Sequence, residues 1–115
     1  MATFTKHFLS GSTSGIGIVV HASDSGTAST IHVAPVGTAS KDEVWLWAYN
    51  GHTADLVLST EWGTSANPRK VTIESQAGLV PTKPGLLIQN GLKITAFAGS
   101  AGMIIVDGFV NRITD

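Results

Sequence analysis

The sequence predicts a single all-β domain, an antiparallel β-sandwich or jelly roll of about eight strands. The first observation is its length of 115 residues, which is that of one ordinary domain. The second is that short runs rich in β-branched and aromatic residues recur roughly every 8–12 residues between clusters of Gly, Pro, Asn and Ser. The third is that no stretch of about 11 residues shows the spacing of an amphipathic helix.

The predicted strands share short length, β-branched or aromatic content and turn residues at both ends. In chain order they are Ile16–Ala22, Thr30–Pro35, Glu43–Tyr49, Asp55–Trp62, Lys70–Glu74, Leu86–Gln89, Leu92–Ala98 and Met103–Ile113. Residues 1–15 precede them, either as an N-terminal arm or as a first strand. Residues 16–115 are predicted to form the sandwich domain.

The turns between these strands have identifiable chemistry. Asn50-Gly51 is expected to open the loop between the two strongest strands, because both residue types tolerate positive φ. Asn90-Gly91 predicts a two-residue hairpin loop that joins the strands on either side of it. Pro81 and Pro84-Gly85 predict a further loop.

Composition excludes several classes of function. The chain has no cysteine, so neither a disulfide framework nor a thiolate site can form. Its net charge of −1 provides no basic surface for nucleic acid. No stretch approaches the ~18 apolar residues of a membrane helix, so no membrane partner is expected. Only 13% of residues are charged, about half the usual share, so either Thr and Ser cover the exterior or partners occupy much of it.

The motifs that could indicate catalysis lack the context they need. Gly11–Gly17 matches the glycine loop of short-chain dehydrogenases, but a poor helix former follows it and the chain is too short for a dinucleotide fold. The histidines show no short metal-ligand spacing; they are His7, His21, His32 and His52. No nucleophile motif is present. We therefore expect a protein that is not an enzyme and has no catalytic residues, cofactor or metal.

The strand Glu43–Tyr49 is apolar on both faces, although a free sandwich strand should be polar on one. Its aliphatic face consists of Val44, Leu46 and Ala48. Its other face carries Trp45, Trp47 and Tyr49. One face is expected to contact either another part of this chain or a neighbouring subunit or ligand.

Fragments along nearly the whole chain carry a resemblance to a known family. They are Phe8–Thr13, Asp42–Ala48, Glu61–Gly63 followed by Pro68, Pro84–Leu86, Asn90–Leu92, Ala96–Ala98 and Gly108–Ile113. In this order they resemble small β-domain proteins encoded beside phage capsid genes, the head decoration or cement proteins of tailed bacteriophages. The resemblance implies a sandwich or jelly roll on the outside of the capsid that clamps neighbouring subunits, with no shared catalytic motif.

The expected partners are the major capsid protein and further copies of this chain, as a dimer or trimer. The expected location is the exterior of the virion capsid, after synthesis in the host cytoplasm. The candidate contact residues are Phe4, His7, Phe8, Trp45, Trp47, Tyr49 and Arg112. One alternative is a tail, baseplate or fibre module. Another is a carbohydrate-binding domain that uses Trp45, Trp47 and Tyr49.

Overall fold

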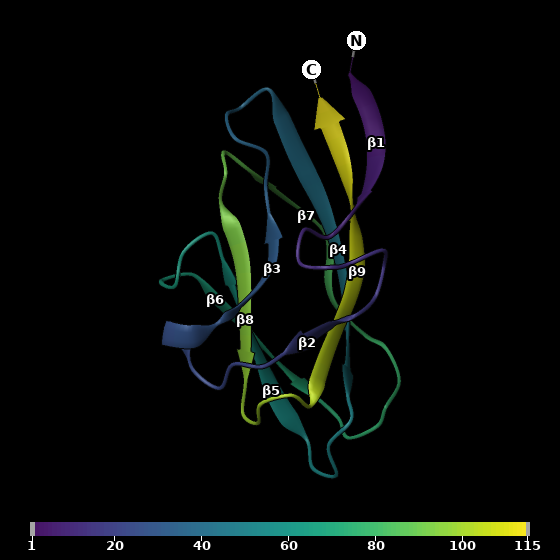
Figure 1. Ribbon diagram of the computed structural model, residues 1–115, viewed down its shortest axis with the longest axis vertical. Helices are drawn as coiled ribbons and strands as arrows, with labels where there is room; N and C mark the ends of the chain where they lie inside the picture. The colour runs from purple at the N-terminus through teal and green to yellow at the C-terminus, as the bar shows by residue number, and fades with distance from the viewer. Residues whose placement is uncertain (1, 115) are drawn as a thin grey trace.

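The computed structural model describes residues 2–114, which form two antiparallel sheets packed face to face (Figure 1). The elements of these residues are β1 (Thr3–Phe8), β2 (Ile18–Val20), the 3-10 turn η1 (Ser25–Thr27), β3 (Ser29–Val33), β4 (Ser40–Asn50), β5 (Leu56–Trp62), β6 (Pro68–Ile73), β7 (Val80–Gln89), β8 (Lys93–Ala98) and β9 (Ile104–Thr114). The predicted all-β sandwich is confirmed.

The first sheet has the strand order β1-β9-β4-β7, and β2 also pairs with β9. The second sheet has the order β3-β8-β5-β6. Because β1 and β2 pair with successive parts of β9, they act as two halves of one interrupted strand. Counted in that way, each sheet has four strands in the order of a jelly roll, and the chain changes sheet at every connection except the one from β5 to β6. Both termini lie at the same end of the first sheet (Figure 1).

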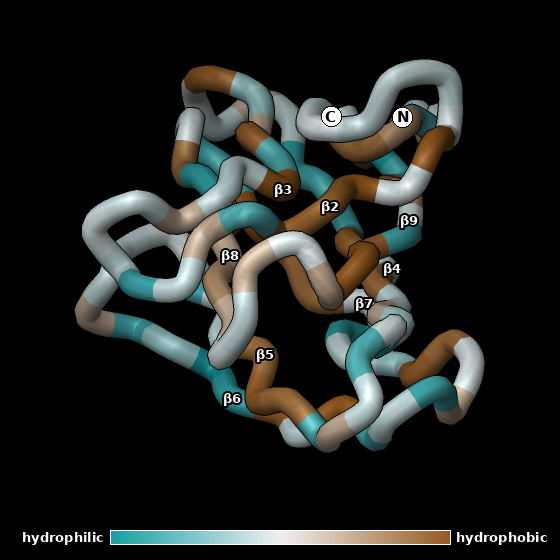
Figure 2. Tube along the Cα trace, turned by 60° about the horizontal axis from the view of Figure 1, so that its bottom comes forward, coloured by the Kyte–Doolittle hydropathy of each residue, from teal (hydrophilic) through white to brown (hydrophobic). Residues whose placement is uncertain are grey.

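The core lies between the sheets and is built by alternation along each strand. On β4 the aliphatic residues Val44, Leu46 and Ala48 are at most 1% exposed, so this is the face that the domain itself buries. Leu58 and Ile94 meet them from the second sheet. Figure 2 shows hydrophobic residues on β2, β5 and the strands around them. Each large aliphatic side chain buried in this way contributes roughly 1.5–3 kcal/mol to stability.

The loop predicted at Pro81 and Pro84-Gly85 is wrong, because these residues lie inside the strand β7. The pairing of β7 with β4 shifts register at two places, once just before Trp45 and once just after Leu46. Since β7 is an edge strand, prolines that cannot donate to a ladder are tolerated there, and bulges absorb the extra residues.

The hairpin predicted at Asn90-Gly91 is also wrong. Both residues have the positive φ that the dipeptide favours, 64° and 71°. However, β7 belongs to the first sheet and β8 to the second, so the turn carries the chain from one sheet to the other. Within residues 2–114, β5 and β6 are the only consecutive strands that pair with each other.

Residues 3–8, expected as an arm or a first strand, form β1. Its six residues pair with β9 without a register shift, and all six are exposed. Among residues 2–114 no helix has the length and apolar character needed to cross a membrane.

Candidate functional site

The outer face of the first sheet carries a group of aromatic side chains on three neighbouring strands. Trp45 of β4 lies opposite Phe109 of β9, and Phe109 lies opposite Phe8 of β1. The rings of Trp45 and Phe109 are nearly parallel, at 13°, with centroids 6.4 Å apart. Trp47 packs on the same ring at 6.1 Å and 28°. Together with Phe4, which lies on the same face of β1, these residues are called the aromatic face below.

Polar groups hold this arrangement in place. The Glu43 carboxylate accepts hydrogen bonds from Trp45 Nε1 at 2.8 Å and from Asn111 Nδ2 at 3.1 Å. These two bonds hold the pKa of Glu43 below its usual value. On the other side, Lys6 Nζ lies over the Phe109 ring, 4.7 Å from its centroid.

The backbone beneath Trp45 also determines where its indole lies. Gly85 of β7 has φ +75°, and a Cβ built there would come within 3.1 Å of the indole. A side chain at this bulge would therefore press against the ring. The glycine allows Trp45 to lie close to β7.

The exposure of the aromatic face is uneven. Phe4 and Phe8 are 69% and 63% exposed, which is unusual for side chains of this size. Trp45, Trp47 and Phe109 are half-buried. A shallow depression of about 610 Å³ opens beside them, and it is lined by Lys6, His7, Phe8, Gly15, Gly108 and Phe109.

The candidate contact residues are not all brought together. Trp45 and Trp47 share a ring neighbour, whereas Tyr49 lies further along β4, opposite Ile105. His7 lies opposite Val110, a core residue, and so belongs to the other face of β1. The central ring, Phe109, was missed by the sequence interpretation. Side chains alternate between the two sheet faces along Met103–Ile113. This alternation could have placed Phe109 on the outer face, because its neighbour Val110 is a core residue.

Arg112 binds a carboxylate of its own chain. Its Nε and Nη2 donate to the two oxygens of Asp42 at 2.8 Å and 3.1 Å. Asp42 is fully buried, and the Arg112 side chain is 29% exposed. The guanidinium that was expected to contact a partner is thus engaged within the first sheet.

Asp42 also belongs to a network that connects the two sheets. The Nε2 atom of His32, on β3, lies 2.6 Å from Asp42 Oδ2. The backbone N–H of Ser10 donates to His32 Nδ1 at 2.9 Å, and Ser10 Oγ lies at the same distance. Because Nδ1 accepts from a backbone N–H, the proton of the neutral imidazole is on Nε2 and points to Asp42.

Burial and hydrogen bonding act in opposite directions on these groups. Burial lowers the pKa of His32 and outweighs the hydrogen bond to Asp42, which favours the protonated form. For Asp42, burial would raise the pKa, but hydrogen bonds from Arg112 and His32 hold it below its usual value. The network is therefore a carboxylate, a guanidinium and a neutral imidazole at neutral pH.

Ser10, His32 and Asp42 form the chemical set of a serine nucleophile, but their hydrogen bonds are those of a structural clamp. Ser10 Oγ accepts from the backbone N–H of Val33 at 3.0 Å, as a residue of an adjacent strand would. The acceptor position of His32 is shared with the Ser10 N–H, and Arg112 already neutralises Asp42. The network thus attaches the loop after β1 to β3 and β4.

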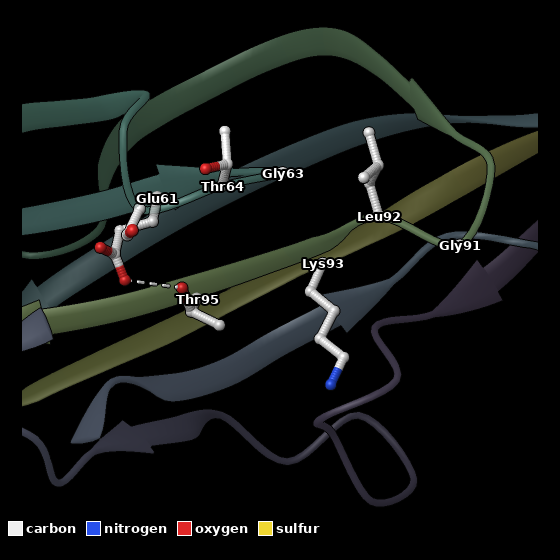
Figure 3. A pocket seen from close by; sticks show the side chains of 8 residues that line it. Glu61, Gly63, Thr64, Gly91, Leu92, Lys93 and Thr95 are labelled. Atoms are coloured by element: carbon white, nitrogen blue, oxygen red, sulfur yellow. Dashed lines mark hydrogen bonds between the residues drawn. The ribbon is translucent and has the colours of Figure 1, made fainter. Parts of the chain in front are cut away.

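A second hollow, of about 380 Å³, lies where the loop after β5 meets the start of β8 (Figure 3). Its carboxylate, Glu61, accepts hydrogen bonds from Thr95, at 3.0 Å, and from Ser25. Lys93 points away from Glu61 in this view. The carboxylate is therefore engaged with hydroxyl groups of its own chain.

Within residues 2–114 no three His, Asp or Glu side chains come together in an arrangement that could hold a metal ion. Comparisons of the chain with protein-family models, curated proteins and solved structures found no match.

Proposed function

We propose that this chain is a structural protein that binds the outside of a tailed-phage capsid through its aromatic face and bridges neighbouring capsid subunits. The single observation that supports the proposal is the aromatic face itself. A sandwich sheet that faces only water should carry polar residues on its outer side, but here five aromatic side chains lie on three adjacent strands.

The energetics suit an assembly role. Trp and other large aromatic side chains are the usual anchors of protein interfaces, where truncation of one costs about 2 kcal/mol or more. Each contact by itself is modest. Because a capsid repeats the same seam many times, a domain that touches two subunits at once gains from effective concentration.

The proposal is tested by co-sedimentation of the purified chain with shells of the major capsid protein that the proposal expects in the same genome. We expect the unmodified chain to bind, and Trp47→Ala to reduce affinity more than about tenfold, because it removes an anchor of the aromatic face. Val57→Ala is the matched control, since Val57 is 45% exposed on a strand of the other sheet. Failure of the unmodified chain to bind, or equal loss in both variants, would overturn the proposal.

A carbohydrate-binding role is the second candidate, favoured by two indoles next to a carboxylate and an amide. Pyranose rings stack on indoles, and Glu43 and Asn111 could bond their hydroxyl groups. Titration of a glycan panel, followed by tryptophan fluorescence, tests this role. A saturable shift that Trp47→Ala abolishes would support it, and a flat response across the panel would count against it.

A further inference from the structure

We propose that β1 is a docking edge for a second copy of this chain. Two copies would join β1 to β1 in antiparallel fashion around a two-fold axis, so that their first sheets form one continuous sheet. The proposal is independent of what the aromatic face binds. It is derived from a comparison of the edge strands in the two sheets.

The β7 and β6 edges are protected against strand addition. β7 has prolines at positions 81 and 84 and two register shifts, so its backbone cannot offer a regular ladder. β6 begins at Pro68 and continues with the cations Arg69 and Lys70. Proline and charge are the usual means by which natural proteins block such edges.

The β3 edge is covered by the loop that follows β1. The Gly11 N–H donates to the Ile31 carbonyl at 3.0 Å, and the Val33 N–H donates to Ser10 Oγ at 3.0 Å. A Cβ at position 11 would lie 2.5 Å from the Thr30 carbonyl oxygen, so only glycine permits this close approach. These two backbone groups of β3 are thereby bonded within the chain and closed to an incoming strand.

β1 has none of these protections. It contains no proline, pairs with β9 over six consecutive residues without a bulge, and is exposed at every residue. Its lysine is directed over the Phe109 ring on the outer face of the sheet. Within residues 2–114, β1 pairs only with β9, so its other side presents backbone N–H and C=O groups to an incoming strand.

The side chains of β1 favour a second copy in one register. A two-fold axis perpendicular to the sheet keeps the same face of both copies on the same side. If the axis passes at Thr5, Lys6 lies opposite the partner's Phe4, which places a cation beside an aromatic ring. If it passes at Lys6, two ammonium groups lie opposite each other, which is unfavourable. An axis at Phe4 or at His7 would pair only three residues of each β1, whereas an axis at Thr5 pairs residues 3–7. The axis is therefore placed at Thr5, with Thr5 opposite the partner's Thr5.

This pairing also explains why association would stop at two copies. Each copy uses its β1 edge once, and the opposite edge of the combined sheet is β7, which is blocked. A two-fold contact between identical surfaces closes on itself and cannot propagate into a fibre. The two aromatic faces would then lie on the same side of one sheet.

Because the chain has no cysteine, single cysteine variants report the register directly. We expect Thr5→Cys to form a disulfide-linked dimer under mild oxidation, whereas Phe4→Cys and Lys6→Cys should each remain uncrosslinked alone. A mixture of Phe4→Cys and Lys6→Cys should form a heterodimer. Val57→Cys, on the second sheet, measures crosslinking by random collision, and circular dichroism checks that each variant is folded.

Light scattering coupled to size exclusion of the unmodified chain completes the test, with a dimer as the expected result. Three outcomes would overturn the proposal. They are a monomer at every concentration, a disulfide-linked dimer of the Lys6→Cys variant by itself, and a crosslinked fraction of Thr5→Cys no larger than that of Val57→Cys. Capsid binding is measured separately by co-sedimentation. A monomer that still binds shells would overturn the β1 contact and leave the proposed function standing.

Discussion

His32 is a buried histidine whose hydrogen bonds connect the two sheets. It lies on β3, is 1% exposed, and faces Asp42 on β4, with Arg112 of β9 beyond it and His7 of β1 nearby. Its Nδ1 accepts the Ser10 N–H, so protonation of this nitrogen would place two donors against each other. Acidification should therefore weaken the attachment of the loop after β1.

We predict that the free energy of unfolding falls as the pH drops below about 6.5, the ordinary pKa of histidine. The pKa of His32 is lowered in the folded state, so the unfolded chain binds more protons in this range and stability is lost. The slope should reach up to about 1.4 kcal/mol per pH unit. Urea titrations from pH 7.5 to 5 measure it.

His32→Gln should flatten this slope, whereas His21→Gln, at an exposed position, should leave it unchanged. Equal slopes in the parent and in His32→Gln would show that another group is responsible. The lowered pKa of Asp42 adds a second loss of stability, which begins only below its ordinary value of 3.8.

Arg112→Ala should destabilise the domain by about 2–3 kcal/mol, because it leaves a fully buried carboxylate with one fewer partner. The expected cost is below that of a completely buried pair, since the Arg112 side chain is 29% exposed. Chemical denaturation measures the change. Arg69→Ala, which removes an exposed side chain bonded to Asn67 and Pro68, should change stability by less than about 0.5 kcal/mol.

The central strand β9 depends on one glycine for its pairing with β4. A Cβ at Gly108 would lie 2.1 Å from the carbonyl oxygen of Trp45, a distance that backbone atoms cannot accommodate without moving. Substitution there must separate the two longest strands or twist them locally.

We predict that Gly108→Ala lowers the free energy of unfolding by about 3 kcal/mol or prevents folding. Gly26→Ala is the control, because a Cβ at that position meets only Asp24 Oδ1, at 3.4 Å. Thermal melting followed by circular dichroism compares the two. Similar melting temperatures would mean that β4 and β9 adjust to the methyl group more easily than the contact suggests.

At Asn90-Gly91 turn chemistry predicted the local conformation but not the strand partner, and at Asn50-Gly51 neither residue has the positive φ that these residue types tolerate. Asn90 and Gly91 both adopt positive φ, as their types favour, yet they connect strands of different sheets. Conversely, Pro81 and Pro84 indicate a loop, but they occupy an edge strand whose outer side needs no donors. Strand pairing is decided by where the faces can be buried, which local residue preferences do not encode.

The whole molecule should fold slowly for its size. Only β5 and β6 form a hairpin between consecutive strands of residues 2–114, and β9 pairs with β1 and β2 from the opposite end of the chain. Since the entropy of closing such long loops is lost before the contacts form, we predict refolding in the range of milliseconds to seconds. Stopped-flow tryptophan fluorescence measures the rate, and recovery of the whole signal within the dead time of mixing would contradict this prediction.

The candidate site was partly predictable. Alternation along Glu43–Tyr49 placed Trp45 and Trp47 on one face, but only the pairing of β4 with β9 brings Phe109 against them. Nothing in the spacing of Ser10, His32 and Asp42 indicated that they would meet. They come from a loop and two strands in different sheets, and the jelly-roll crossing brings them together.

The sequence by itself determined the all-β class, the positions of most strands and the two faces of β4, because these follow from periodicity and from residues that fit a pleated backbone. Only the tertiary structure decided which strands are neighbours, which face of β4 enters the core, that Arg112 binds Asp42, and that β1 is an open edge. Those outcomes depend on contacts between residues far apart in the chain. Such contacts are selected by packing the whole core at once, and no local pattern specifies them.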